Sequence, residues 1–173
     1  MLTLSLLRHA KSSWISPVLP DQDRPLTQRG VADAPLMGRA MAKHGIDPVL
    51  VLCSSARRTR DTLALVLPEL KVEPRFIYED ALYHATASEM LKELRALDTG
   101  VASVMLVGHN PEIHALALDL IGSGPQPLKL RLIEKLPTTG FVVLTFPFSA
   151  WGDVTVNSGE LKLFLTPKLL AGG

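Results

Sequence analysis

The chain has 173 residues, of which 47% are hydrophobic and 20% are charged. This length fits one domain that buries its own core, and we expect residues 1–173 to form a single domain. The composition is that of a globular protein and not of a disordered chain. A net charge of +1 gives no overall field to attract nucleic acid or an acidic membrane, so any anion site must be local.

The first predicted element is a buried strand, because positions 2, 4, 6 and 7 are all leucine. The run is too short for a membrane span and lacks the basic start of a signal peptide. The lone Cys53 excludes an intramolecular disulfide and suits a reducing compartment. We therefore expect a soluble, cytoplasmic protein with no membrane partner.

A loop and a helix follow the first strand. Residues 12–24 contain prolines and aspartates without a sustained period, which predicts a loop. Thr27 is a candidate N-cap for a helix that runs to about Lys43. Pro35 lies inside that pattern and removes one hydrogen bond, so we expect a kink or a break there.

The middle of the chain alternates strands and helices. Residues 49–53 predict a buried strand, and residues 59–67 a helix. A shorter strand is predicted over 75–78. Thr86 and Glu89 have the spacing of a capping box at the start of the next helix.

In the last part of the chain, the sequence pattern changes from one typical of parallel strands to one typical of antiparallel strands. A strand over 101–107 leads through Gly108-His109-Asn110-Pro111 into a helix that ends near Gly122. A loop containing Pro125 and Pro127 is expected next, and then two strands over 141–146 and 161–165 with no helix between them. These elements together predict an α/β fold, a three-layer α/β/α sandwich around a mostly parallel mixed sheet.

Cationic and imidazole side chains follow three of these strands. Arg8 and His9 end the first strand, Arg57 and Arg58 follow the second, and His109 follows the fourth. In an open α/β sheet ligands bind at the carboxyl ends of the strands. Guanidinium groups bind phosphate oxygens in forked geometry, and a neutral imidazole can act as a nucleophile. Without a metal-ligand spacing or a glycine-rich phosphate loop, neither a metal nor another cofactor is expected.

These residues carry a resemblance to a known family. Leu7-Arg8-His9-Ala10 resembles the signature of the histidine phosphatase superfamily, which has the phosphoglycerate mutase-like fold, and Lys11-Ser12-Ser13-Trp14 resembles its SixA-type phosphohistidine phosphatase branch. Four further segments match in order, namely Arg24-Pro25-Leu26-Thr27 with Gly30, Ser54-Ser55-Ala56-Arg57-Arg58 with Thr62, Gly108-His109-Asn110-Pro111, and Leu136-Pro137-Thr138-Thr139-Gly140.

The resemblance implies roles for particular residues. It makes His9 the nucleophile that becomes phosphorylated, Arg8 and Arg58 the phosphate ligands, and His109 a second histidine that stabilises charge on the phosphoryl group. Lys11 and Asn110 are expected to contact the substrate. We expect a backbone carbonyl to orient His9 through its other ring nitrogen.

Two features depart from the family pattern. Ser55 stands where the family usually has proline. No segment clearly matches the acidic proton donor of the larger members, and Glu79 and Asp80 are only weak candidates for it.

The implied function is a metal-independent phosphohistidine phosphatase that acts on a phosphorylated protein or peptide. A phosphatase for small phosphorylated substrates and a non-catalytic module that binds a phosphorylated ligand are the alternatives. The basic residues Lys129, Arg131 and Lys135 are interpreted as a solvated surface.

Overall fold

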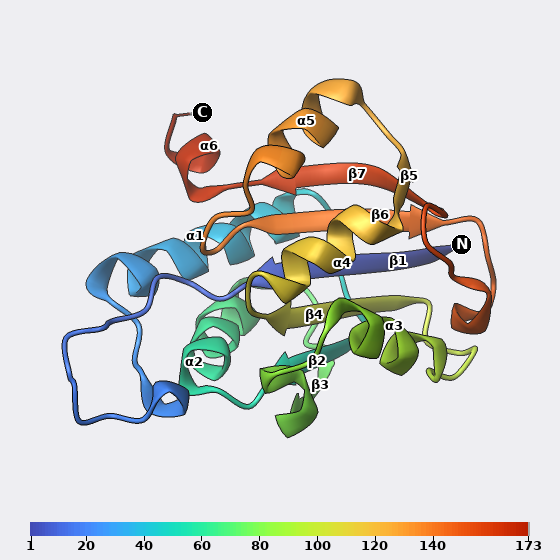
Figure 1. The fold of residues 1–173 in the computed structure, drawn as a ribbon. Coiled ribbons are helices and arrows are strands. Elements are labelled where there is room, and N and C mark those ends of the chain that lie inside the picture. The colour runs from blue at the N-terminus through green and yellow to red at the C-terminus, as the bar shows by residue number, and fades with distance from the viewer. Residues whose placement is uncertain (173) are drawn as a thin grey trace.

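A seven-stranded sheet forms the middle layer of the computed structural model, which describes residues 1–172 (Figure 1). The strand order is β3-β2-β4-β1-β6-β7-β5. Four of the six strand pairs are parallel, and β6 is antiparallel to both β1 and β7. The strands are β1 (Leu2–Arg8), β2 (Leu50–Ser54), β3 (Arg75–Glu79), β4 (Ser103–Gly108), β5 (Ile121–Ser123), β6 (Phe141–Phe146) and β7 (Gly159–Leu165).

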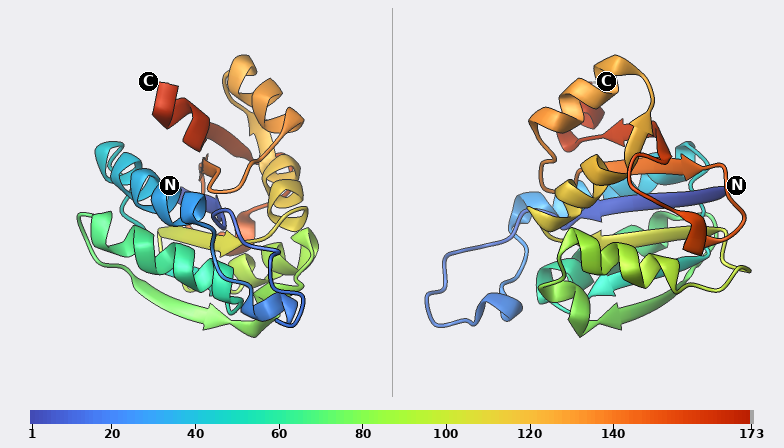
Figure 2. Two further views of the ribbon diagram at one scale, coloured as in Figure 1. Left: turned by 90° about the vertical axis from the view of Figure 1, so that its left-hand side faces the viewer. Right: turned by 45° about the vertical axis from the view of Figure 1, so that its right-hand side comes forward.

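Helices cover both faces of the sheet, which confirms the predicted three-layer sandwich (Figure 2). The helices are α1 (Gln28–Lys43), α2 (Arg57–Val66), α3 (Ala87–Arg95), α4 (Glu112–Leu120), α5 (Gln126–Glu134) and α6 (Pro167–Gly172). The short 3-10 turns are η1 (Asp21–Asp23), η2 (Leu67–Glu69), η3 (Asp80–Tyr83) and η4 (Trp151–Asp153). One apolar core lies between the sheet and α1 with α2, and the other lies between the sheet and α3 with α4.

The central strands are buried on both faces, as expected for strands with helices on each side. In β1, Leu4 and Leu6 belong to the core under α3 and α4, whereas Leu7 belongs to the core under α1 and α2. Cys53 is fully buried inside β2. The apolar run at the start of the chain is therefore the middle of the sheet. Within residues 1–172 no helix is long and apolar enough to cross a membrane.

The predicted helix caps are present. The Thr27 hydroxyl accepts a hydrogen bond from the Gly30 N–H at 3.1 Å, and Thr86 and Glu89 form the reciprocal bonds of a capping box. The expected break at Pro35 is wrong, because α1 is continuous from Gln28 to Lys43. Packing of its buried face against the sheet holds the helix together at that position.

The expected loop after Gly122 is also wrong. The chain forms the short strand β5, pairs it with β7, and then forms the nine-residue helix α5. Pro125 is the N-cap of α5, and Pro127 lies in its first turn. Proline is tolerated there because the backbone N–H groups of a first turn have no partner inside the helix.

Candidate active site

The candidate site lies at the carboxyl ends of β1, β4 and β2, which are neighbours in the sheet. Arg8 pairs in register with Gly108, and Cys53 pairs with Val107. The three strands therefore end at one edge, and the residues that follow them meet there, as predicted. The loop between β1 and α1 extends beyond the same edge (Figure 1).

His9 is held in one orientation at the end of β1. Its side chain is only 7% exposed, and its Nδ1 lies 2.7 Å from the carbonyl oxygen of Ala10. A carbonyl can only accept a hydrogen bond, so Nδ1 carries the proton and Nε2 keeps a free electron pair. The expected orientation by a backbone carbonyl is confirmed.

Thr62 connects this segment to α2. Its hydroxyl accepts a hydrogen bond from the Ala10 N–H at 2.9 Å and donates one to the Arg58 carbonyl at 2.7 Å. The His9 segment and the turn that carries Arg58 are thereby fixed relative to each other.

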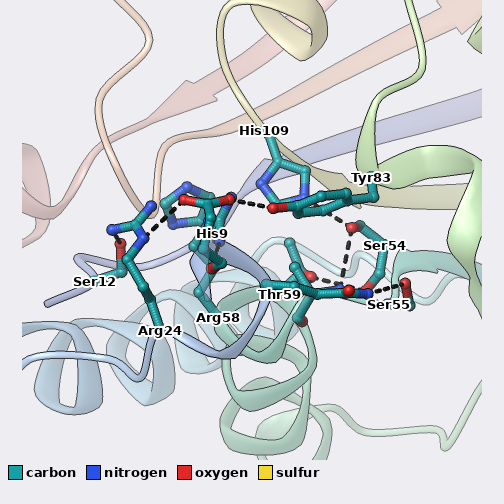
Figure 3. Close-up of polar contacts among 12 residues, drawn as sticks. His9, Ser12, Arg24, Ser54, Ser55, Arg58, Thr59, Tyr83 and His109 are labelled. Carbon is teal, nitrogen blue, oxygen red and sulfur yellow. Dashed lines mark hydrogen bonds and ion pairs between the residues drawn. The ribbon is translucent and has the colours of Figure 1, made fainter. Parts of the chain in front are cut away.

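His109 faces His9, with 5.4 Å between the ring centroids. Its Nε2 lies 2.7 Å from the hydroxyl of Ser54, the last residue of β2 (Figure 3). Among the described residues, its buried Nδ1 has no hydrogen-bond partner. A buried polar atom without a partner is costly unless a ligand satisfies it.

Both histidines are neutral at physiological pH. Burial, together with the nearby guanidinium of Arg58, lowers the pKa of His9 to about 4 and that of His109 to about 3. The hydrogen bond from His9 to the Ala10 carbonyl opposes this effect only in part. A neutral His9 with a free Nε2 is the reactive form of a histidine nucleophile.

Two arginines bring fixed positive charge to the histidines. Arg58 is 6% exposed, and it donates hydrogen bonds to the backbone oxygen and the carboxylate of Asp21 at 2.8 and 3.1 Å. Arg8 donates to the Leu136 carbonyl at 3.1 Å, and burial lowers its pKa. The Nε atoms of both arginines are buried without a partner among residues 1–172.

Three residues of the site were not predicted, namely Asp21, Arg24 and Tyr83. The Asp21 carboxylate bonds Arg24 at 3.0 Å, and it also accepts a hydrogen bond from the Tyr83 hydroxyl. The Tyr83 hydroxyl and the two arginines lower the Asp21 pKa to about 2. The Tyr83 ring packs edge-on against His109. Asp21 begins the short 3-10 turn η1 and Tyr83 ends the 3-10 turn η3, and in such short turns residue spacing does not indicate which side chains converge. Arg24 lies in one of the segments that match the family, but no role was predicted for it from the sequence.

The two histidines, the arginines and Asp21 line a cavity of about 320 Å³, which we call the phosphate pocket. Lys11 and Asn110, the two expected substrate contacts, both line it. Asn110 donates to the Leu136 carbonyl at 2.9 Å, and its buried Oδ1 has no partner in the part of the chain that the structure describes. The lining residues are Arg8, His9, Lys11, Ser12, Trp14, Asp21, Arg24, Arg58, His109, Asn110 and Thr138.

Glu79 and Asp80 are not among the residues that line the phosphate pocket. The carboxylate that does line it belongs to Asp21. Arg57 is exposed and pairs with Asp61 on the surface of α2, as expected for a helix-start residue. The ring of His84 packs edge-on against that of Tyr83, and neither residue is among those that line the phosphate pocket. In residues 1–172 no three His, Cys, Asp or Glu side chains form a group that could hold a metal ion.

Comparison with known proteins identifies the class. Residues 4–83 match the histidine phosphatase superfamily (branch 1). A candidate phosphohistidine phosphatase SixA from Agrobacterium tumefaciens is 33% identical, with a TM-score of 0.81 over 96% of this chain and 98% of that one. Another from Nakamurella multipartitia, also 33% identical, has a TM-score of 0.78 over 96% of each chain.

A curated relative covers the same length. An uncharacterised protein of Mycobacterium leprae is 35% identical over 166 residues, which are 94% of this chain and all of that protein. The chain therefore belongs to the histidine phosphatase superfamily. It is a phosphatase with a histidine nucleophile, and its fold is the phosphoglycerate mutase-like fold that the sequence resemblance implied.

Proposed function

We propose that the chain is a metal-independent phosphohistidine phosphatase that acts on a phosphorylated protein or peptide through a phospho-His9 intermediate. One observation carries this proposal. The buried, neutral imidazole of His9 donates from Nδ1 to the Ala10 carbonyl, which leaves Nε2 as the nucleophile in a pocket lined by guanidinium groups.

Two transfers of one phosphoryl group make up the reaction. The electron pair of His9 Nε2 attacks phosphorus, and the P–N bond of the substrate breaks with its electrons on the departing imidazole nitrogen. Water then attacks phosphorus, the P–Nε2 bond returns its electrons to His9, and both protons of the water leave with orthophosphate. Phosphoryl transfer depends mainly on positioning and charge neutralisation. Arg8, Arg58 and His109 supply these as preorganised groups around the equatorial oxygens.

Among the described residues, the site offers no good proton donor to a leaving group, and a phosphohistidine substrate does not require one. Tyr83, Arg58 and Arg24 hold the Asp21 carboxylate ionised, so it is a poor proton donor. The leaving imidazole of a phosphohistidine needs no donor when its other ring nitrogen carries a proton, whereas an alkoxide leaving group does. Two structures of candidate phosphohistidine phosphatases at 33% identity support the same substrate class.

The test is phosphate release from a phosphohistidine peptide by the wild-type chain and by His9→Ala. We expect His9→Ala to lose activity, while His44→Ala, an exposed histidine at the end of α1, keeps it. Undiminished release by His9→Ala would contradict the nucleophile. A higher kcat/KM on a phosphosugar or phosphoserine substrate would contradict the substrate class, and loss of activity with a chelator would contradict the metal-free mechanism.

A further inference from the structure

A second cavity, of about 830 Å³, lies next to the phosphate pocket and shares Arg8, Lys11 and Thr138 with it. We call it the basic groove. Its lining includes residues from the end of α5, the end of β7 and α6. A ligand bound in the groove therefore lies next to the phosphate pocket.

Positive charge is concentrated in this groove. Six cationic residues line it, against Glu134 as the acidic one, although the whole chain has a net charge of only +1. The cationic residues are Arg8, Lys11, Arg29, Arg131, Lys135 and Lys168. A cavity lined by one sign of charge focuses the field and attracts the opposite charge.

Little of this charge is neutralised within the chain. Of the six cationic residues, Arg29 is the one that forms an ion pair within residues 1–172. Its Nε lies 3.5 Å from the carboxylate of Asp33. Arg131 lies over the ring of Phe164, with 5.1 Å from its Cζ to the ring centroid. Lys135 and Lys168 are exposed. From the sequence, Arg131 and Lys135 are interpreted as part of a solvated surface. In the structure, α5 and the residue after it place them in the lining of a groove.

Apolar side chains also line the groove, namely those of Pro137, Phe164 and Leu169. The cations come from separate parts of the chain, namely the end of β1 with the segment after it, α1, α5 with the residue after it, and α6. A compact anion would need the cations to converge on one point, as they do in the phosphate pocket. Cations spread among apolar side chains suit an extended segment with several carboxylates along it.

We propose that the basic groove binds an acidic segment of the protein substrate, next to the phosphorylated histidine that enters the phosphate pocket. This inference rests on the proposed function. Charge complementarity of this kind raises the association rate and selects among partners. The chain would then distinguish phosphohistidine proteins by the charge of the sequence around the modified residue.

The test compares two phosphohistidine peptides with one core sequence, flanked on both sides by glutamates in one and by glutamines in the other. For the wild-type chain we expect the KM of the glutamate peptide to be about tenfold lower than that of the glutamine peptide, with the same kcat for both. The double variant Lys135→Glu with Lys168→Glu removes this preference, and Glu134→Lys strengthens it. The control pair Lys71→Glu with Lys92→Glu has the same net charge but lines neither cavity, and it keeps the preference.

Fluorescence anisotropy measures binding of the unphosphorylated acidic peptide. This measurement separates the groove proposal from the phosphatase proposal. Turnover of both peptides with equal KM values would overturn the groove and leave the phosphatase proposal standing. Binding that the Lys135→Glu, Lys168→Glu variant abolishes, without turnover of either peptide, would uphold the groove and overturn the phosphohistidine activity. Equal loss of preference in the control pair would also overturn the groove.

Discussion

At the scale of single residues, the site combines neutral histidines with permanently charged arginines. A phosphoryl dianion would raise the pKa of a nearby imidazole, and protonation would remove the nucleophilic electron pair. Burial opposes this by keeping the pKa of His9 at about 4. The free chain thus holds His9 ready for attack before any substrate arrives.

The same burial makes stability depend on pH. In the unfolded chain a histidine has a pKa near 6.5, whereas His9 and His109 have values of about 4 and about 3 in the fold. Between the folded and unfolded pKa values, the unfolded chain binds more protons at these histidines than the folded chain does. Their contribution to the free energy of unfolding is therefore largest above pH 6.5 and falls as the pH drops. Each histidine contributes up to about 1.4 kcal/mol per pH unit.

Urea unfolding at several pH values between about 4.5 and 7 measures this slope. We expect His9→Gln and His109→Gln each to show a smaller slope than the wild-type chain. The same slope in all three proteins would mean that neither histidine is held neutral by the fold.

Arg58 offers a second residue-scale prediction. Lysine keeps the charge of Arg58 but cannot reproduce a planar fork of donors. We expect Arg58→Lys to lower kcat/KM for a phosphohistidine peptide by about 100-fold or more. The matched control is Arg57→Lys, because the neighbouring Arg57 is exposed and lines neither cavity. Similar kinetics for the two variants would remove Arg58 from the set of phosphate ligands.

At the scale of elements, the start of α1 supports the segment that follows His9. The Thr27 N–H and hydroxyl both donate to the Lys11 carbonyl, at 2.9 and 3.2 Å. Gly30 lies so close that a Cβ atom there would be 2.2 Å from the same carbonyl oxygen. The first turn of α1 thus fixes the backbone two residues after the nucleophile.

We expect Gly30→Ala to destabilise the fold by about 1–3 kcal/mol, because the Lys11 backbone must move to make room. The displacement reaches the His9 segment, so kcat is expected to fall as well. Thermal unfolding and initial rates measure the two effects. Gly100→Ala is the control, since nothing lies within 4 Å of its added Cβ. Unchanged stability in Gly30→Ala would show that the contact relaxes at no cost.

The elements also show what the sequence could and could not predict. The strands that carry Arg8, Cys53 and Val107 were predictable, because each is a short apolar run that ends in polar residues. Helix α5 was missed because Pro125 and Pro127 are usual loop residues, and only their position at the start of the helix makes them compatible with it. The Asp21 contacts depend on the path of a long loop, which no local period encodes.

At the scale of the whole molecule, the sheet joins distant parts of the chain. Strand β1 lies between β4 and β6, so the start of the chain pairs with residues 100 or more positions later. We propose that residues 1–172 unfold as one domain. In a Trp14→Phe background, the fluorescence of the buried Trp151 should change at the same urea concentration as the far-UV circular dichroism. Two separate transitions would show that the halves of the chain are independent.

The central place of β1 also has a consequence for the timing of synthesis. The residues that make the nucleophile leave the ribosome before either neighbour of their strand, because β4 and β6 both come later in the chain. The Gly140 carbonyl that accepts a hydrogen bond from the Arg8 N–H lies directly before β6. Domains fold as units while chains grow at roughly 5–20 residues per second. A nascent chain therefore carries His9 for several seconds without a formed pocket, and it becomes competent for catalysis only after β6 has been synthesised.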